Sequence, residues 1–297
     1  MRLRNSFLVA VLALGGCLRK PAETSVFIDP QFAALVPPDT TLLVGLRVEH
    51  LVKTPLYQKY LTGKISIIDK FARATGINPE KRLWNLLLVS NGRDSFVLGR
   101  GKFADELMAP DFSKKGVARF GYKGLTLFGD EQQAMLMVNS STIAMGDTPT
   151  LRALVDGRTS FMGLAERLRA LTNQVPYETQ FWGVYVGGPL NLPLSGNLEN
   201  ANKVLGLMGN GIFYFDVRQG VTGTITGVAA NPQDAQQAHD GLVGFLGLGR
   251  MMIPKNQSDL ARALDGIQVT QEGQRVTVKI NESDELAGTL VGLLLTQ

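Results

Sequence analysis

Cysteine and histidine are almost absent from this 297-residue sequence, which has one cysteine and two histidines. A single cysteine cannot form a disulfide within the chain, and a structural zinc site needs more ligands than this chain offers in good types. His50 and His239 lie far apart in the sequence, and neither belongs to a His-x-x-x-His pattern. Because histidine is the usual general base and metal ligand near neutral pH, we expect no metal, no cofactor and no catalytic residues.

Concentrated positive charge is also missing, although the isoelectric point of the sequence is about 9.2. The chain has 30 Lys+Arg against 26 Asp+Glu, and basic clusters go no further than pairs such as Lys81-Arg82. Nucleic-acid binders carry basic stripes or interleaved aromatics, so we expect no nucleic acid as a partner. Leu286–Leu295 is the nearest approach to a long apolar run in the mature chain, and it is shorter than the roughly 20 residues that span a bilayer.

The amino terminus has the pattern of a secretory signal. Arg2 and Arg4 precede a short apolar segment, Phe7–Leu14, and the only cysteine follows at position 17. The stretch Leu14-Gly15-Gly16-Cys17 resembles the lipobox of bacterial lipoproteins. The resemblance implies cleavage between Gly16 and Cys17 and attachment of fatty acyl chains, palmitate among them, to Cys17. The alternative is an ordinary secretory signal that contains a cysteine.

Lipid on Cys17 would hold the mature protein at a membrane surface, because each buried methylene group contributes about 0.8 kcal/mol. The next residue is Leu18 rather than the Asp that retains some lipoproteins at the inner membrane. We therefore expect an exported protein anchored in the cell envelope, on the outer membrane facing the periplasm where the host has one. The expected boundaries are residues 1–16 for the signal peptide, 17–31 for the lipidated tether, 32–158 for a first repeat and 159–297 for a second.

Turn residues and apolar runs predict many strands. Leu83–Ser90 and Ser95–Arg100 flank Asn91-Gly92, a dipeptide that strongly favours a hairpin. The other expected strands are residues 40–48, 117–122, 125–128, 134–138, 142–145, 181–186, 212–218, 221–228, 267–271 and 275–280. The expected helices are residues 54–76, 104–108, 149–155, 161–171, 198–207, 232–248, 258–264 and 284–295.

The two halves of the chain repeat the same order of elements. Ser141–Asp147 and Val276–Glu282 both read as a strand that ends in an acidic residue, and each precedes a helix with similar apolar spacing. We therefore predict an α+β fold made by tandem duplication of a mainly antiparallel sheet, with helices packed on one face. A chance match of two generic patterns is the alternative.

Three segments of the mature chain carry a family resemblance. Val36-Pro-Pro-Asp-Thr-Thr-Leu-Leu-Val-Gly, Thr54-Pro-Leu-Tyr and Thr75-Gly-Ile-Asn-Pro before Leu83-Trp resemble a family of bacterial envelope proteins with no assigned activity. The resemblance covers most of the mature chain. It implies the same fold and location and supplies no catalytic residues.

The segment Gly244–Pro254 combines glycine with large apolar residues and two adjacent methionines. Methionine suits adaptable surfaces, so one hypothesis is an exposed contact patch for a partner, a lipid or an apolar ligand. The residues of this patch are Phe245, Leu246, Met251, Met252 and Ile253. The alternative is a helix end folded over the core, and the spacing of Gly241, Gly244 and Gly247 likewise favours a helix packed closely on a sheet.

Three functions are compatible with these observations. The first is a membrane-anchored, non-enzymatic module that binds or scaffolds an envelope protein. The second is a carrier that holds an apolar or lipid-like ligand, which requires an apolar cavity. The third is a hydrolase with a dispersed site, which requires a polar cleft at His50 or His239. Acidic pairs such as Asp130-Glu131 suit glycoside hydrolysis in principle, but they are more typical of solvated turns.

Overall fold

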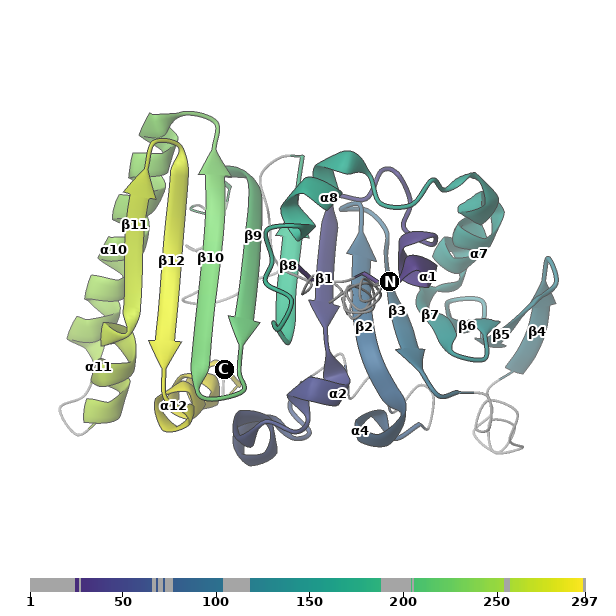
Figure 1. Ribbon diagram of the computed structural model, residues 1–297, viewed down its shortest axis with the longest axis horizontal. Coiled ribbons are helices and arrows are strands. Elements are labelled where there is room, and N and C mark those ends of the chain that lie inside the picture. Colours follow the sequence, from purple (N-terminus) through teal and green to yellow (C-terminus); the bar gives the residue numbers. More distant parts are fainter. Residues whose placement is uncertain are drawn as a thin grey trace, which may run out of the picture.

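A computed structural model describes residues 25–26, 28–65, 68, 72, 77–103, 118–187, 204, 206–253 and 257–295. Within these residues, twelve strands form one sheet in the order β11-β12-β10-β9-β8-β1-β2-β3-β7-β6-β5-β4, as Figure 1 shows face-on. Every neighbouring pair in that order is antiparallel. The α+β class and the antiparallel sheet predicted from the sequence are thereby confirmed.

The first half of the chain contributes seven strands to the sheet. These strands are β1 (Leu42–Leu46), β2 (Leu83–Ser90), β3 (Ser95–Gly101), β4 (Ala118–Tyr122), β5 (Leu125–Gly129), β6 (Gln133–Asn139) and β7 (Thr142–Asp147). The helical elements of this half are α1 (Pro30–Ala33), α2 (Val48–Leu51), η1 (Tyr57–Leu61), α4 (Pro79–Arg82), α7 (Thr148–Gly157) and η2 (Arg158–Ser160).

The second half contributes five strands to the same sheet. These are β8 (Phe181–Tyr185), β9 (Met208–Asp216), β10 (Val221–Ala229), β11 (Ile267–Glu272) and β12 (Arg275–Glu282). Its helices are α8 (Glu166–Thr172), α10 (Pro232–Met252), α11 (Ser258–Asp265) and α12 (Asp284–Leu295). The helices expected at residues 104–108 and 198–207 fall mainly on parts of the chain that the structure does not describe.

The strand order confirms the duplication. Counted outward from the middle of the sheet, the first half runs β1-β2-β3-β7-β6 and the second runs β8-β9-β10-β12-β11. The two central strands join the halves, with Leu42 opposite Tyr185 and Leu46 opposite Phe181. The strands β7 and β12 have similar sequence patterns and hold equivalent places in the two halves. The pair β4-β5 extends the first half alone.

Helices cover both faces of the sheet, whereas the sequence led us to expect them on one. On β2, Leu87 belongs to a core with side chains of α7 and α8, and its neighbour Leu86 belongs to a core with side chains of α2 and α12. Successive strand residues point to opposite faces. β2 is a continuous apolar run, so its side chains have to be buried by helices on both faces of the sheet. The buried Ala235 and Ala238 of α10 pack on the face that carries α2.

Local turns explain the hairpins and two differences from the expected helices. Gly92 adopts φ 89° between β2 and β3, and Gly273 adopts φ 57° between β11 and β12. Gly163 has φ 81°, which an α-helix cannot accommodate, so α8 begins at Glu166 rather than at Phe161. Gly63 has φ 69° and follows the π-helical turn η1, so the helix expected to run from Thr54 onward ends there.

The amino-terminal segment is built into the domain earlier than expected. The backbone N–H of Val26 donates to the carbonyl of Val175 at 2.8 Å, and Ser25 forms an isolated bridge with Pro176. Asp29 caps α1 by accepting from the N–H of Gln31 at 2.8 Å. Ser25 and Val26 are therefore already packed on the domain, inside the stretch expected to be tether up to residue 31. Among the described residues, no helix is both long and apolar enough to cross a membrane.

Candidate functional site

The two histidines do not share a site. His50 lies at the end of α2, with Nε2 3.4 Å from Glu49 Oε1 and 3.2 Å from Arg47 Nη2. His239 lies in α10, with Nδ1 3.0 Å from Asp240 Oδ1. α2 follows the central strand β1, whereas α10 lies at the β11 end of the sheet (Figure 1). Across the described part of the chain, no group of three or more His, Cys, Asp or Glu side chains is placed to hold a metal ion.

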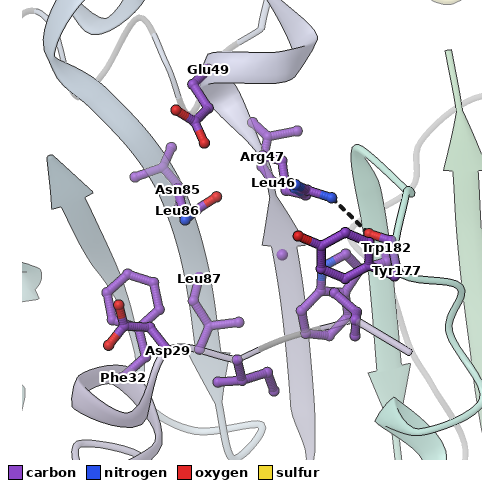
Figure 2. A pocket seen from close by; sticks show the side chains of 13 residues that line it. Asp29, Phe32, Leu46, Arg47, Glu49, Asn85, Leu86, Leu87, Tyr177 and Trp182 are labelled. Atoms are coloured by element: carbon purple, nitrogen blue, oxygen red, sulfur yellow. Dashed lines mark hydrogen bonds between the residues drawn. The ribbon is translucent and has the colours of Figure 1, made fainter. Parts of the chain in front are cut away.

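A cavity of about 230 Å³ lies where the amino-terminal segment crosses β1 and β2, and we call it the Arg47 cavity (Figure 2). Trp182 and Tyr177 stand on one side of Arg47 in this view, and Asn85 and Glu49 stand on the other. The lining residues are Val26, Ile28, Asp29, Phe32, Gly45, Leu46, Arg47, Glu49, Asn85, Leu86, Leu87, Tyr177 and Trp182.

The guanidinium of Arg47 is already engaged. Its Nη1 donates to the carbonyl of Tyr177 at 2.6 Å, and its centre lies 4.9 Å from the centroid of the Tyr177 ring (Figure 2). Partial burial, followed by the charge of Arg47, lowers the pKa of His50, while Glu49 opposes that shift. The neutral imidazole is therefore favoured.

The residue types around the Arg47 cavity are suited to binding a small molecule. No Ser, Thr, Cys or Lys is among the described residues that line it. Apolar side chains surround it together with the amide of Asn85 and the carboxylate of Glu49, so its walls offer hydrogen bonds and apolar contact to a small molecule. His50 borders this cavity through its contacts with Arg47 and Glu49.

A second cavity, of about 360 Å³, lies between the β2–β3 hairpin and α7, and we call it the Asp39 cavity. Val89, Phe96 and Leu154 form a buried apolar floor. Asp39, Asn91 and Asp94 stand at the polar side of the cavity, where Asn91 Nδ2 donates to Asp39 Oδ2 at 2.8 Å. The remaining lining residues are Pro37, Thr40, Ser90, Pro149, Thr150, Ala153, Gly157 and Phe161.

The structure places the apolar segment after Gly244 mainly within α10. Met251 and Met252 are 84% and 76% exposed, and Phe245 is 43% exposed. Leu246 and Ile253 are half-buried. Close packing is found at Gly241, where a Cβ would stand 3.1 Å from Cγ2 of Val204. It is not found at Gly244 or Gly247, where a Cβ would meet no atom of the described residues within 4 Å.

The other sequence candidates do not converge on either cavity. Asp130 sits on an exposed turn, where it accepts from the backbone N–H groups of Gln132 and Gln133 at 2.7 and 2.8 Å. These backbone bonds lower the pKa of Asp130, which is the behaviour of a turn-stabilising carboxylate. The lipidation and cleavage residues Gly16 and Cys17 lie outside the part of the chain that the structure describes.

The residues that the fold brings together at the cavities were not predicted from the sequence. Asp39 follows Pro37-Pro38, and Asn91 precedes Gly92, so both carried only turn signals. Arg47 lies between β1 and α2 and showed no sequence pattern of its own. The one usable signal was the clustering of Asp39, Asn91 and Asp94 at predicted turns, which a sheet places at one end of neighbouring strands.

No family model matches this sequence, and no curated protein matches it. Solved structures do resemble the fold. Crystal form III of TP0453 aligns with a TM-score of 0.55, covering 91% of this chain and 99% of that chain. Crystal form I of TP0453 aligns with a TM-score of 0.52, covering 90% and 98%. Sequence identity is 13% in both comparisons, so the likeness supports the α+β fold alone.

Proposed function

We propose that this chain is a lipid-anchored protein of the bacterial cell envelope that binds another envelope protein and catalyses no reaction. The lipobox-like Leu14-Gly15-Gly16-Cys17, which contains the only cysteine of the sequence, supports the anchor. Ser25 packs on the domain, eight residues after Cys17 (25 − 17). An extended chain of that length reaches roughly 26–29 Å, so the domain stays close to the membrane surface.

One observation carries the binding function, namely the exposed apolar side of α10. Leu248, Met251 and Met252 are 61%, 84% and 76% exposed in the second half of this helix. Each large apolar side chain left in water forgoes about 1.5–3 kcal/mol of burial. Contiguous exposed apolar residues are typical of protein interaction sites. Ala235 and Ala238 are buried and pack the first half of α10 against the sheet. This packing holds the exposed apolar end of the helix in a fixed position.

Site-specific cross-linking in intact cells tests this proposal. A photoreactive amino acid at Met251 should give one discrete protein adduct of the full chain. The matched control is Gln237, which is exposed on the same helix among polar neighbours and should give none. The additional substitution Leu248→Lys should abolish the adduct at Met251. Equal adducts at positions 237 and 251, or adducts with lipid alone, would contradict binding of a protein at this surface.

A second function, a carrier for an apolar ligand, is favoured by the Asp39 cavity. Its volume of about 360 Å³ falls within the range of small-molecule sites, and its floor is apolar. Native mass spectrometry of the protein, released gently from its own envelope fraction, tests this function. A reproducible additional mass in the small-molecule range is expected for a carrier. A mass equal to that of the bare chain in every preparation would count against it.

A further inference from the structure

We propose that the Asp39 cavity binds a molecule with an apolar body and one ammonium or guanidinium group. This inference rests on the carrier function and names the class of ligand that the cavity takes. The three features that carry it are a buried apolar floor, unpaired acceptor groups at the mouth and the absence of cationic side chains among the described lining residues.

The apolar floor selects the body of the ligand. Val89, Phe96 and Leu154 are 1%, 5% and 3% exposed, and they come from β2, β3 and α7. Phe161, which is half-buried, closes one side of the cavity. Three separate elements therefore hold these side chains in place, and the floor remains formed without a ligand.

The acceptor groups select the charge of the ligand. Asp39 Oδ2 accepts a hydrogen bond from the side-chain amide of Asn91, which orients the carboxylate. Asp39 Oδ1 and the carboxylate of Asp94 have no partner among the described residues. Thr40, which is 1% exposed, lines the same cavity beside these acceptors.

Several donor groups that would favour an anion are already occupied. α7 begins beside the cavity, but Pro149 has no N–H to offer, and the N–H of Thr148 donates to the carbonyl of Gln132 at 3.0 Å. The amide oxygen of Asn91 accepts from the N–H groups of Arg93 and Asp94 at 3.0 and 2.8 Å, and its NH₂ donates to Asp39. Asp39 and Asp94 are the charged residues among the described lining residues, so the charge of the cavity is negative and attracts a cation.

Three probes with the same apolar body test the inference by calorimetry on the full chain. They are 4-phenylbutylamine, 4-phenylbutanol and 5-phenylpentanoate. We expect the amine to bind at least tenfold more tightly than the alcohol, and the carboxylate to bind more weakly than both. Asp94→Asn should reduce the affinity for the amine at least threefold and leave the alcohol unchanged. The control Glu272→Gln, an exposed acid on β11, should change neither.

The outcomes separate the ligand class from the carrier function. If the amine and the alcohol bind equally, or if Asp94→Asn and Asp39→Asn leave the amine unaffected, the cationic class is wrong while the cavity still binds apolar molecules. If no probe binds to a chain that is folded by circular dichroism, both the ligand class and the carrier function at this cavity are overturned. Asp39→Asn is the second variant because its amide retains a contact with Asn91.

Discussion

The indole ring of Trp182 lies over Gly45 at the junction between the two halves of the sheet. The two residues are opposite each other on β8 and β1, and a Cβ built on Gly45 would stand 2.2 Å from Cε2 of the indole. Trp182 is 3% exposed and also lines the Arg47 cavity. The missing side chain of Gly45 therefore makes room for the ring that packs the centre of the molecule.

Gly45→Ala should destabilise the protein by about 1–3 kcal/mol, because the added methyl group forces the buried indole to move. The free energy of unfolding in urea measures the effect. The matched control is Gly209→Ala on β9, where the nearest atom to a Cβ is the carbonyl oxygen of Val228 at 3.7 Å. Equal losses in the two variants would show that strand glycines in general, and not the Trp182 contact, set the stability.

The sequence predicted those parts of the fold that depend on local chemistry. Asn91-Gly92 specifies a tight turn, and β2 and β3 begin and end within one residue of the expected bounds. α10 was expected to end at Leu248 but continues to Met252, because no proline or strained residue interrupts it there. The duplication was also visible, since both halves use the same order of strands.

The cavities could not be predicted from the sequence because each depends on contacts between distant residues. Asp39 meets Asn91 across 52 positions, and Arg100 meets Asp29 across 71. Helices on both faces were missed for a related reason. A continuous apolar strand shows that both of its faces are buried, but it does not show which helices cover them.

Arg100→Gln should loosen the amino-terminal segment. Arg100 Nε donates to Asp29 Oδ2 at 2.9 Å, with the two side chains 16% and 22% exposed, and Nη1 donates to Gln31 Oε1 at 3.0 Å. Hydrogen bonds that involve charged groups contribute about 1.5–3 kcal/mol when they are partly buried. We expect a loss of that size in the free energy of unfolding, with faster proteolysis near α1. Unchanged proteolysis would show that Val26 and Phe32 hold the segment without this ion pair.

Glu282→Gln should change how stability depends on pH. Glu282 is 7% exposed, its Oε1 has no hydrogen-bond partner, and burial raises the pKa of its carboxyl above 4.5. An acid with a raised pKa in the folded state stabilises fully below its unfolded pKa, and that stability is lost as pH rises through the folded pKa. Relative to the wild type, the variant should therefore gain stability as pH rises above about 4.5. Thermal denaturation from pH 4 to 8 measures this difference, and a constant difference across the range would contradict it.

Cys17→Ser should abolish anchoring. Because Cys17 is the only cysteine, metabolic labelling of the full chain with palmitate has a single thiol to report. The wild type should carry label and sediment with membranes, and the variant should lose the label and leave the membrane fraction. Membrane association of the unlabelled variant would show that another part of the chain, such as the apolar end of α10, suffices for attachment.

Gly244→Ala and Gly247→Ala should each stabilise the protein by about 0.5–1 kcal/mol. Both glycines lie within α10, and a Cβ at either position would meet no atom of the described residues within 4 Å. Alanine loses less backbone entropy than glycine in a helix, so the folded state gains where nothing opposes the added methyl group. Thermal denaturation measures the gain.

The same two variants also test why glycine stands at these two positions of α10, where it gives the folded chain no packing advantage. If a bound partner approaches the α10 backbone closely, the alanines should lower the yield of cross-linking from Met251 although the protein is more stable. A gain in stability with undiminished cross-linking would place the contact on the side chains of Leu248, Met251 and Met252 alone. A loss of stability in either variant would contradict the exposed position of these glycines. It would show that this part of α10 packs against the rest of the chain.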